Sequence, residues 1–211
     1  MIYKCFFLTL FCFSMQVSAG NDKKIKIDGL SNFVLASMNT AFNEGVKLSL
    51  VNKNNQSYPR YIDLYYSQVK FKLAAVFDDS SRVIIPFKFP IGEELSDVGL
   101  TEKDTNSYFL GAYDFDGDGA SEIVFGVVDF DAGTNLSNVA VNIYSYTPPL
   151  NLKDQGRLKN WDHLAQLVAM GIVGDVKIKF DKSSISIPRN HRGFFYEYTW
   201  VKDRFIDTGE Y

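Results

Sequence analysis

The chain has 211 residues, of which 46% are hydrophobic and 15% aromatic, and its formal net charge is −3 at neutral pH. No excess of basic residues attracts a nucleic acid backbone, so charge argues against a nucleic acid partner. Both cysteines, Cys5 and Cys12, lie near the N-terminus, so residues 20–211 hold no thiol for a disulfide, a thiolate metal site or a nucleophile.

Residues 1–19 have the features of a secretory signal peptide. One cation, Lys4, precedes the apolar run CFFLTLFCF, and the small residues Ser18 and Ala19 follow. This run is about half of the roughly 20 apolar residues that a membrane-spanning helix needs, which argues against a membrane anchor. We therefore expect cleavage after Ala19 and a periplasmic or secreted protein with no transmembrane segment after that cleavage.

We expect residues 20–211 to form a single β-rich domain, because no linker rich in Pro, Gly or Ser divides them. Apolar residues at helical intervals predict two short peripheral helices, at 31–44 and 161–170. Residues 21–28 are polar and basic, and we expect them to fray. Strands are predicted at 46–51, 61–77, 83–89, 108–113, 122–128, 139–146, 176–180, 184–188, 194–201 and 204–207. The predicted fold class is mainly β and antiparallel, either a sandwich or a partial propeller-like fold.

The segment AYDFDGDGASEIVFG, residues 112–126, is the candidate metal site. Calcium takes six to eight oxygen ligands, and a short segment supplies them when alternate side chains turn toward one point. Three acids have that spacing, and two glycines permit the tight backbone path between them. A backbone carbonyl, that of Ala120, adds a further oxygen. The acids are Asp114, Asp116 and Asp118.

The spacing of the closing acid distinguishes this loop from an EF-hand. An EF-hand places a glutamate at the twelfth position, which here is Phe125, whereas the acid Glu122 stands at the ninth. The pattern D-x-D-G-D-G-x-x-[DE] before an apolar strand resembles the calcium loops of FG-GAP and VCBS repeats. That resemblance implies that Ca²⁺ is bound by Asp114, Asp116, Asp118, Glu122 and the carbonyl of Ala120. The alternative is a turn rich in Asp and Gly that forms without a metal.

No catalytic constellation stands out in the sequence. The chain has two histidines, His163 in the second predicted helix and His191 in the turn PRNHRG. The motifs G-x-S-x-G, H-E-x-x-H and G-x-G-x-x-G are missing. Hydrolysis by two carboxylates stays open, because their pairing is invisible in a sequence. We expect a protein that is not an enzyme.

Two further segments have both a binding and a structural interpretation. The turn that holds His191 and Arg192 is cationic, and it is either an anion-binding corner or a solvated hairpin tip. An alternating run of aromatic residues is either a ligand platform or the inner face of a strand. Its members are Phe194, Tyr196, Tyr198 and Trp200.

The layout of the whole chain carries a second resemblance. A signal segment, a central YDFDGDGASEIVFGVVD, then VNIYSY and an aromatic tail are similar to CarG-like carbapenem self-resistance proteins. That resemblance implies protection without hydrolysis, either antibiotic self-resistance or toxin immunity, through a protein or small-molecule ligand in the cell envelope. The alternatives are a surface adhesion or carbohydrate-binding module, and a secreted hydrolase.

Overall fold

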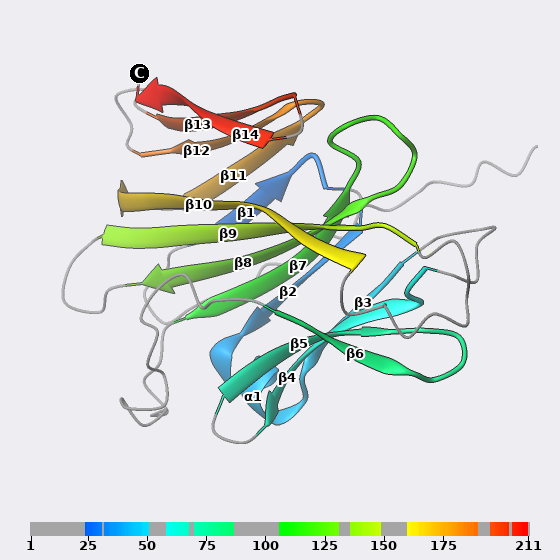
Figure 1. Cartoon of the computed structure of the whole chain (residues 1–211). Helices are drawn as coiled ribbons and strands as arrows, with labels where there is room; N and C mark the ends of the chain where they lie inside the picture. The colour runs from blue at the N-terminus through cyan, green and yellow to red at the C-terminus, as the bar shows by residue number, and fades with distance from the viewer. Residues whose placement is uncertain are drawn as a thin grey trace, which may run out of the picture.

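A computed structural model describes residues 24–30, 32–50, 58–67, 70–86, 106–130, 136–148, 160–189, 195–202 and 204–210. Within these ranges the chain is mostly β, which confirms the predicted fold class, and the helical part is one short segment, α1 (Met38–Asn43). Figure 1 shows the strands arranged as three sheets in a layered, sandwich-like stack. None of the helices in the described ranges is long and apolar enough to span a membrane.

The three sheets differ in position and are named accordingly. The central sheet has the order β10 (Trp161–Val173), β9 (Leu136–Tyr146), β8 (Glu122–Phe130), β7 (Ser107–Tyr113) and β2 (Asn32–Ser37). The terminal sheet has the order β1 (Ile25–Asp28), β11 (Val176–Asp181), β12 (Ser184–Pro188), β13 (Phe195–Val201) and β14 (Arg204–Glu210). The small sheet has the order β3 (Val46–Ser49), β4 (Tyr61–Ser67), β5 (Lys70–Val76) and β6 (Arg82–Ile85).

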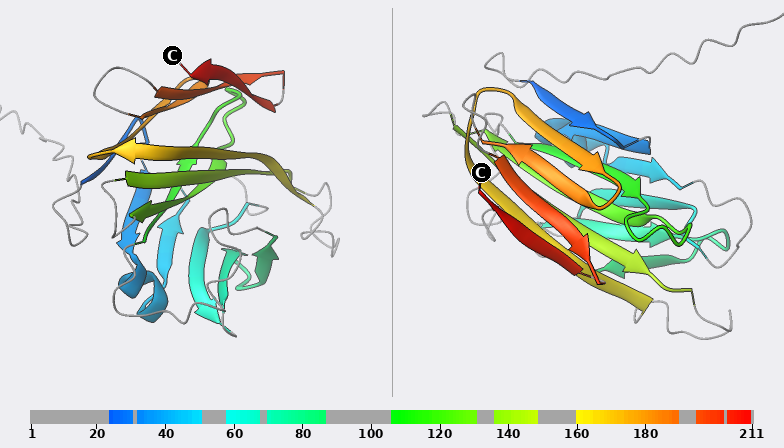
Figure 2. Two further views of the ribbon diagram at one scale, coloured as in Figure 1. Left: turned by 90° about the vertical axis from the view of Figure 1, so that its left-hand side faces the viewer. Right: turned by 90° about the horizontal axis from the view of Figure 1, so that it is seen from above.

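The central sheet is buried on both faces. Figures 1 and 2 show the terminal sheet over one face and the small sheet over the other. Val124 and Val128 of β8 pack in the cluster shared with the terminal sheet, whereas Phe125 and Val127 pack in the cluster shared with the small sheet. A strand covered on both sides has no polar face. This explains why β8, with the sequence EIVFGVVDF, is an almost continuous apolar run.

A glycine in β8 makes room for an aromatic ring between two layers. Gly126 lies opposite Phe109 of β7 in the antiparallel register. A Cβ atom built on Gly126 would stand 2.0 Å from the Phe109 ring, far inside van der Waals contact. Gly126 therefore allows the Phe109 ring to lie flat across the neighbouring strand, within the cluster shared with the terminal sheet.

The predicted strands are present wherever the structure describes them, with one difference in the small sheet. The segment 61–77, predicted as one strand, forms β4 and β5, which pair with each other antiparallel. The turn at 78–81 joins β5 to β6, and the amide of Ser81 donates to the Asp79 carboxylate at 2.9 Å. Residues 87–89 lie outside the described ranges.

The helix predicted at 31–44 is wrong in its first half. Residues 32–37 form β2, which pairs antiparallel with β7 at the edge of the central sheet. Helix α1 covers only 38–43, and its N-cap is Ser37, whose hydroxyl accepts from the amide of Thr40 at 3.3 Å. Pairing with β7 overrides the helical spacing, because alternate residues of β2 form backbone hydrogen bonds with a strand that the sequence alone does not identify as its partner.

The helix predicted at 161–170 is also wrong, because this segment lies within the 13-residue strand β10. Bulges interrupt its pairing with β9 between His163 and Ala165 and between Ala169 and Ile172. A bulge inserts an extra residue into the strand. Apolar residues packed toward the terminal sheet therefore recur at spacings of two and three, and the threes imitate a helix. Those residues are Leu164, Leu167, Ala169 and Ile172.

The part of the N-terminal segment that the structure describes, from residue 24, forms strand β1 rather than a frayed end. Strand β1 pairs in parallel with β11 at the edge of the terminal sheet. The amide of Lys24 donates to the Asp175 carboxylate at 3.1 Å, and the amide of Val176 donates to the carbonyl of Lys24 at 3.0 Å. Ile25 is buried. Contacts with a strand about 150 residues later therefore fix this segment.

Candidate metal centre

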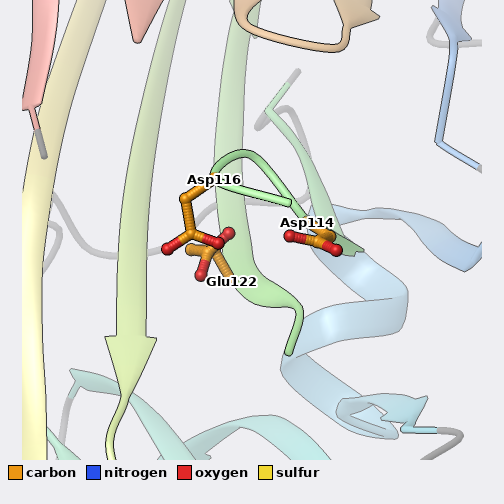
Figure 3. A group of neighbouring side chains, drawn as sticks. All are labelled: Asp114, Asp116 and Glu122. Atoms are coloured by element: carbon orange, nitrogen blue, oxygen red, sulfur yellow. The ribbon is translucent and has the colours of Figure 1, made fainter. Parts of the chain in front are cut away.

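The aspartate loop joins β7 to β8. The last pair of the hairpin ladder is Tyr113 with Glu122, so residues 114–121 form the connection at one end of the central sheet. Figure 3 shows the side chains of Asp114, Asp116 and Glu122 at this loop, with the carboxylates of Asp116 and Glu122 directed toward one another. One oxygen from each of the three lies within 4.8 Å of the others. The structure thus brings together three of the four side chains predicted as calcium ligands.

Hydrogen bonds within the loop hold these carboxylates in place. The two oxygens of Asp114 accept from the amides of Gly117 at 2.7 Å and Gly119 at 3.0 Å. An oxygen of Asp116 accepts from the amide of Asp118 at 3.0 Å. Gly117 and Gly119 have φ angles of 77° and 88°, which other residues adopt only with strain. The glycines therefore set the backbone path that turns the acids inward.

The other two predicted ligands, Asp118 and Ala120, do not join this group. The carboxylate of Asp118 accepts from the amide of Ala120 at 2.7 Å. Its side chain stands apart from the three converging acids, and Ala120 is partly exposed. Their roles as calcium ligands remain predictions.

Glu122 is the buried member of the group, with 3% of its surface exposed. Its carboxylate accepts from the amide of Phe115 at 2.9 Å. Burial raises the pKa of Glu122 from 4.5 to about 7, the Phe115 hydrogen bond opposes that shift, and the charges of Asp116 and Asp114 add to it. Burial also leads the causes that raise the pKa of Asp116, with the neighbouring acids adding repulsion. Without a cation, negative charge in this loop is therefore unfavourable.

Phe115 anchors the loop in the core, a role that the sequence analysis missed. Its side chain is buried in the cluster between the central and terminal sheets. Its ring centroid lies 4.7 Å from that of Tyr113, 6.3 Å from Phe180 of β11 and 5.0 Å from Phe205 of β14. The sequence signal is an aromatic residue in the middle of an acidic loop. The amide of Phe115 also donates a hydrogen bond to Glu122. Phe115 therefore links the cluster of acids to the packing between the central and terminal sheets.

The acids of the loop contribute to raised pKa values of two tyrosines, Tyr58 and Tyr113. Burial and the charges of Asp118 and Glu122 raise the pKa of Tyr58, which packs against the cluster next to the small sheet. Burial and the charges of Asp181 and Asp114 raise the pKa of Tyr113. The charges of the loop therefore act on tyrosines that pack against two different core clusters.

The candidate histidine and the aromatic run have structural roles where they are described. The Nε2 atom of His163 lies 3.0 Å from the Asn142 side-chain oxygen, and because an amide oxygen only accepts, Nε2 donates. Tyr196 and Tyr198 face the core, and the Tyr198 hydroxyl donates to the carbonyl of Val168 at 2.8 Å. The run is thus the inner face of β13. His191, Arg192 and Phe194 lie outside the described ranges.

Comparison of the chain with protein-family models, with curated proteins and with solved structures gave no match.

The raised pKa of Glu122 predicts how the stability of the metal-free protein depends on pH. Between about pH 4.5 and 7 the folded state keeps a proton that the unfolded state has released, so the free energy of unfolding falls as the pH rises. The loss reaches about 3 kcal/mol if the full shift is realised. Urea unfolding in chelator at several pH values measures it. Glu122→Gln should remove this component, and an identical pH dependence in that variant would contradict the assignment.

The anchoring role of Phe115 predicts a large cost for its removal. Phe115→Ala should lower the free energy of unfolding by about 3–5 kcal/mol, as expected for a buried phenylalanine. It should also change the fluorescence of Trp200, whose ring centroid lies 5.0 Å from that of Phe205. Phe42→Ala removes the same atoms from a side chain that is 40% exposed and should cost far less. Equal costs for the two variants would show that Phe115 is not an anchor.

Proposed function

We propose that this chain is an exported, non-catalytic binding protein whose aspartate loop holds a structural calcium ion. The observation that supports the ion is the convergence of three carboxylates from one hairpin, with an oxygen of each within 4.8 Å of the others and one of the acids buried. A divalent cation among them would offset both the mutual repulsion and the cost of burying Glu122.

The donor atoms favour calcium over other metals. The three converging side chains offer only oxygen, which suits hard cations, whereas zinc and copper prefer nitrogen and sulfur ligands. Calcium accepts six to eight oxygens in flexible geometry, so Asp118, the carbonyl of Ala120 and water can complete its shell after small movements. Magnesium demands a near-ideal octahedron and keeps much of its own water. An extended turn with adaptable carboxylates is the better match for calcium.

The ion would stabilise the loop rather than take part in a reaction. The ion would hold the carboxylate of Glu122, which accepts a hydrogen bond from the amide of Phe115. The ring of Phe115 in turn packs against Phe205 of the terminal sheet. The described histidine, His163, donates its Nε2 hydrogen to Asn142. These contacts support a scaffold in which calcium strengthens the stack of sheets, with ligand recognition elsewhere on the surface.

The proposal also covers where the protein acts and what it does there. The signal-like residues 1–19 support export to the periplasm or the exterior, where calcium sites with dissociation constants of about 10⁻⁴ to 10⁻³ M can fill. The similarity of the chain's layout to CarG-like proteins supports self-protection against an antibiotic or toxin. The partner would then be a protein or a small molecule of the cell envelope.

Thermal unfolding with calcium and with chelator tests the ion. At a calcium concentration about 100 times the dissociation constant, the ion should stabilise the fold by about 2.7 kcal/mol, which raises the midpoint by roughly 5–10 °C for a chain of this size. Asp116→Asn should remove most of that shift. The matched control is Asp79→Asn, in the turn between β5 and β6, whose carboxylate also accepts a backbone amide.

Two results would contradict the proposal. A midpoint indifferent to calcium, or a shift that survives Asp116→Asn, would remove the metal site. Turnover of a carbapenem or of peptidoglycan by the purified protein would show that the chain is an enzyme.

A further inference from the structure

The aspartate loop contains two Asp–Gly peptide bonds, Asp116–Gly117 and Asp118–Gly119. An Asp–Gly bond rearranges without an enzyme, because glycine has no side chain to shield its amide nitrogen. That nitrogen attacks the carboxyl carbon of the preceding aspartic acid side chain. A new carbon–nitrogen bond forms, and the carboxyl hydroxyl and the amide hydrogen leave together as water. The product is a cyclic imide, a succinimide, within the main chain.

Water then reopens the succinimide at either of its two carbonyl carbons. Hydrolysis of the new bond restores aspartate, whereas hydrolysis of the original peptide bond gives isoaspartate, in which the main chain runs through the former side chain. Neither step needs an oxidant, a reductant or any reactant other than water. Isoaspartate adds one methylene group to the main chain and leaves a free carboxylate on it. In the aspartate loop this product would move the carboxylates that converge there.

Both Asp–Gly bonds of the loop are open to water. Asp116, Gly117, Asp118 and Gly119 are all exposed. A Cβ atom built on Gly117 or on Gly119 would meet no atom within 4 Å, so no neighbouring group packs against these two residues. Packing therefore does not prevent the rearrangement at either bond.

Hydrogen bonds within the loop oppose the rearrangement. The amides of Gly117 and Gly119, which supply the attacking nitrogens, donate to the two carboxylate oxygens of Asp114 at 2.7 Å and 3.0 Å. The carboxyl groups that would be attacked accept from other amides, Asp116 from Asp118 at 3.0 Å and Asp118 from Ala120 at 2.7 Å. Each ring closure must break both kinds of bond. Asp114 thus holds both attacking nitrogens, one with each oxygen.

We propose that the two Asp–Gly bonds of the aspartate loop are a site of isoaspartate formation, and that Asp114 suppresses the reaction by binding both glycine amides. The inference goes beyond the proposed function and uses only hydrogen bonds within the loop, so it does not depend on a bound ion. It gives Asp114 a protective role in addition to the role of a calcium ligand.

A third Asp–Gly bond, Asp28–Gly29 at the end of β1, is an internal reference. Asp28 is paired with Lys179 in the register of β1 with β11. A Cβ atom built on Gly29 would stand 2.0 Å from the carbonyl oxygen of Phe180, so the backbone at Gly29 packs directly against β11. Strand pairing and this close packing hold the bond in place. We expect it to react slowly whether or not Asp114 is present.

Ageing of the full protein after signal removal tests the proposal. The protein is kept at neutral pH with chelator for several weeks, and peptide mapping by mass spectrometry follows, with electron-transfer fragmentation to distinguish isoaspartate from aspartate. The same protein unfolded in guanidinium chloride gives the rate without these hydrogen bonds. In the folded protein the loop should form isoaspartate at least about fivefold more slowly, the factor that one net hydrogen bond supplies.

Two variants of Asp114 and one control assign the protection. Asp114→Ala frees both glycine amides and should accelerate the reaction in the loop by about fivefold or more. Asp114→Asn keeps one acceptor oxygen and should give an intermediate rate. The control Asp79→Ala removes another turn carboxylate, which accepts the amide of Ser81, and should leave the rate in the loop unchanged. Circular dichroism checks the fold of each variant.

Three results would overturn the proposal. They are a folded loop that reacts as fast as the unfolded chain, an Asp114→Ala variant that reacts as slowly as the parent protein, and an equal acceleration in Asp79→Ala or at Asp28–Gly29. If Asp114→Ala does not fold, Asp114→Asn carries the same comparison. Chelator is present throughout, so these results are independent of the calcium site.

Discussion

Repulsion among the carboxylates at the β7–β8 connection is the constraint on which the rest of the account depends. Asp114, Asp116 and Glu122 converge on one point, and Glu122 is held there out of solvent. The backbone of the same loop carries Phe115 into the core between the central and terminal sheets. The amide of Phe115 donates a hydrogen bond to the Glu122 carboxylate. The position of the acids is therefore coupled to the burial of the Phe115 ring. A cation in the loop would therefore stabilise the stacking of two sheets as well as one turn.

The layered fold commits the central sheet to packing. The central sheet has its two faces covered, so most of its side chains are committed to packing. The aspartate loop lies at one end of the central sheet and offers oxygen donors that suit a structural ion. Packing on both faces of the central sheet helps to hold the ends of β7 and β8, and so the carboxylates of the loop, at fixed spacing.

Local chemistry in the sequence was predictable, and long-range pairing was not. The acids and glycines of the loop act within nine residues, so their spacing alone indicated that carboxylates would converge. By contrast, the strand β10 was mistaken for a helix because its first bulge leaves Leu164 and Leu167 three residues apart on the same face, as in a helix. The partner of β1 stands about 150 residues away, and no local pattern identifies it. Phe115 was overlooked because its role depends on Phe180 and Phe205, which only the folded chain brings near.

A crystal structure determined from crystals grown in calcium, with anomalous data that identify the ion, tests the central claim most directly. The account predicts a single peak at the β7–β8 loop, with oxygen atoms of Asp114, Asp116 and Glu122 about 2.4 Å from it. Water alone in that position, with the three carboxylates still converging, would contradict the claim that a divalent cation holds the loop together.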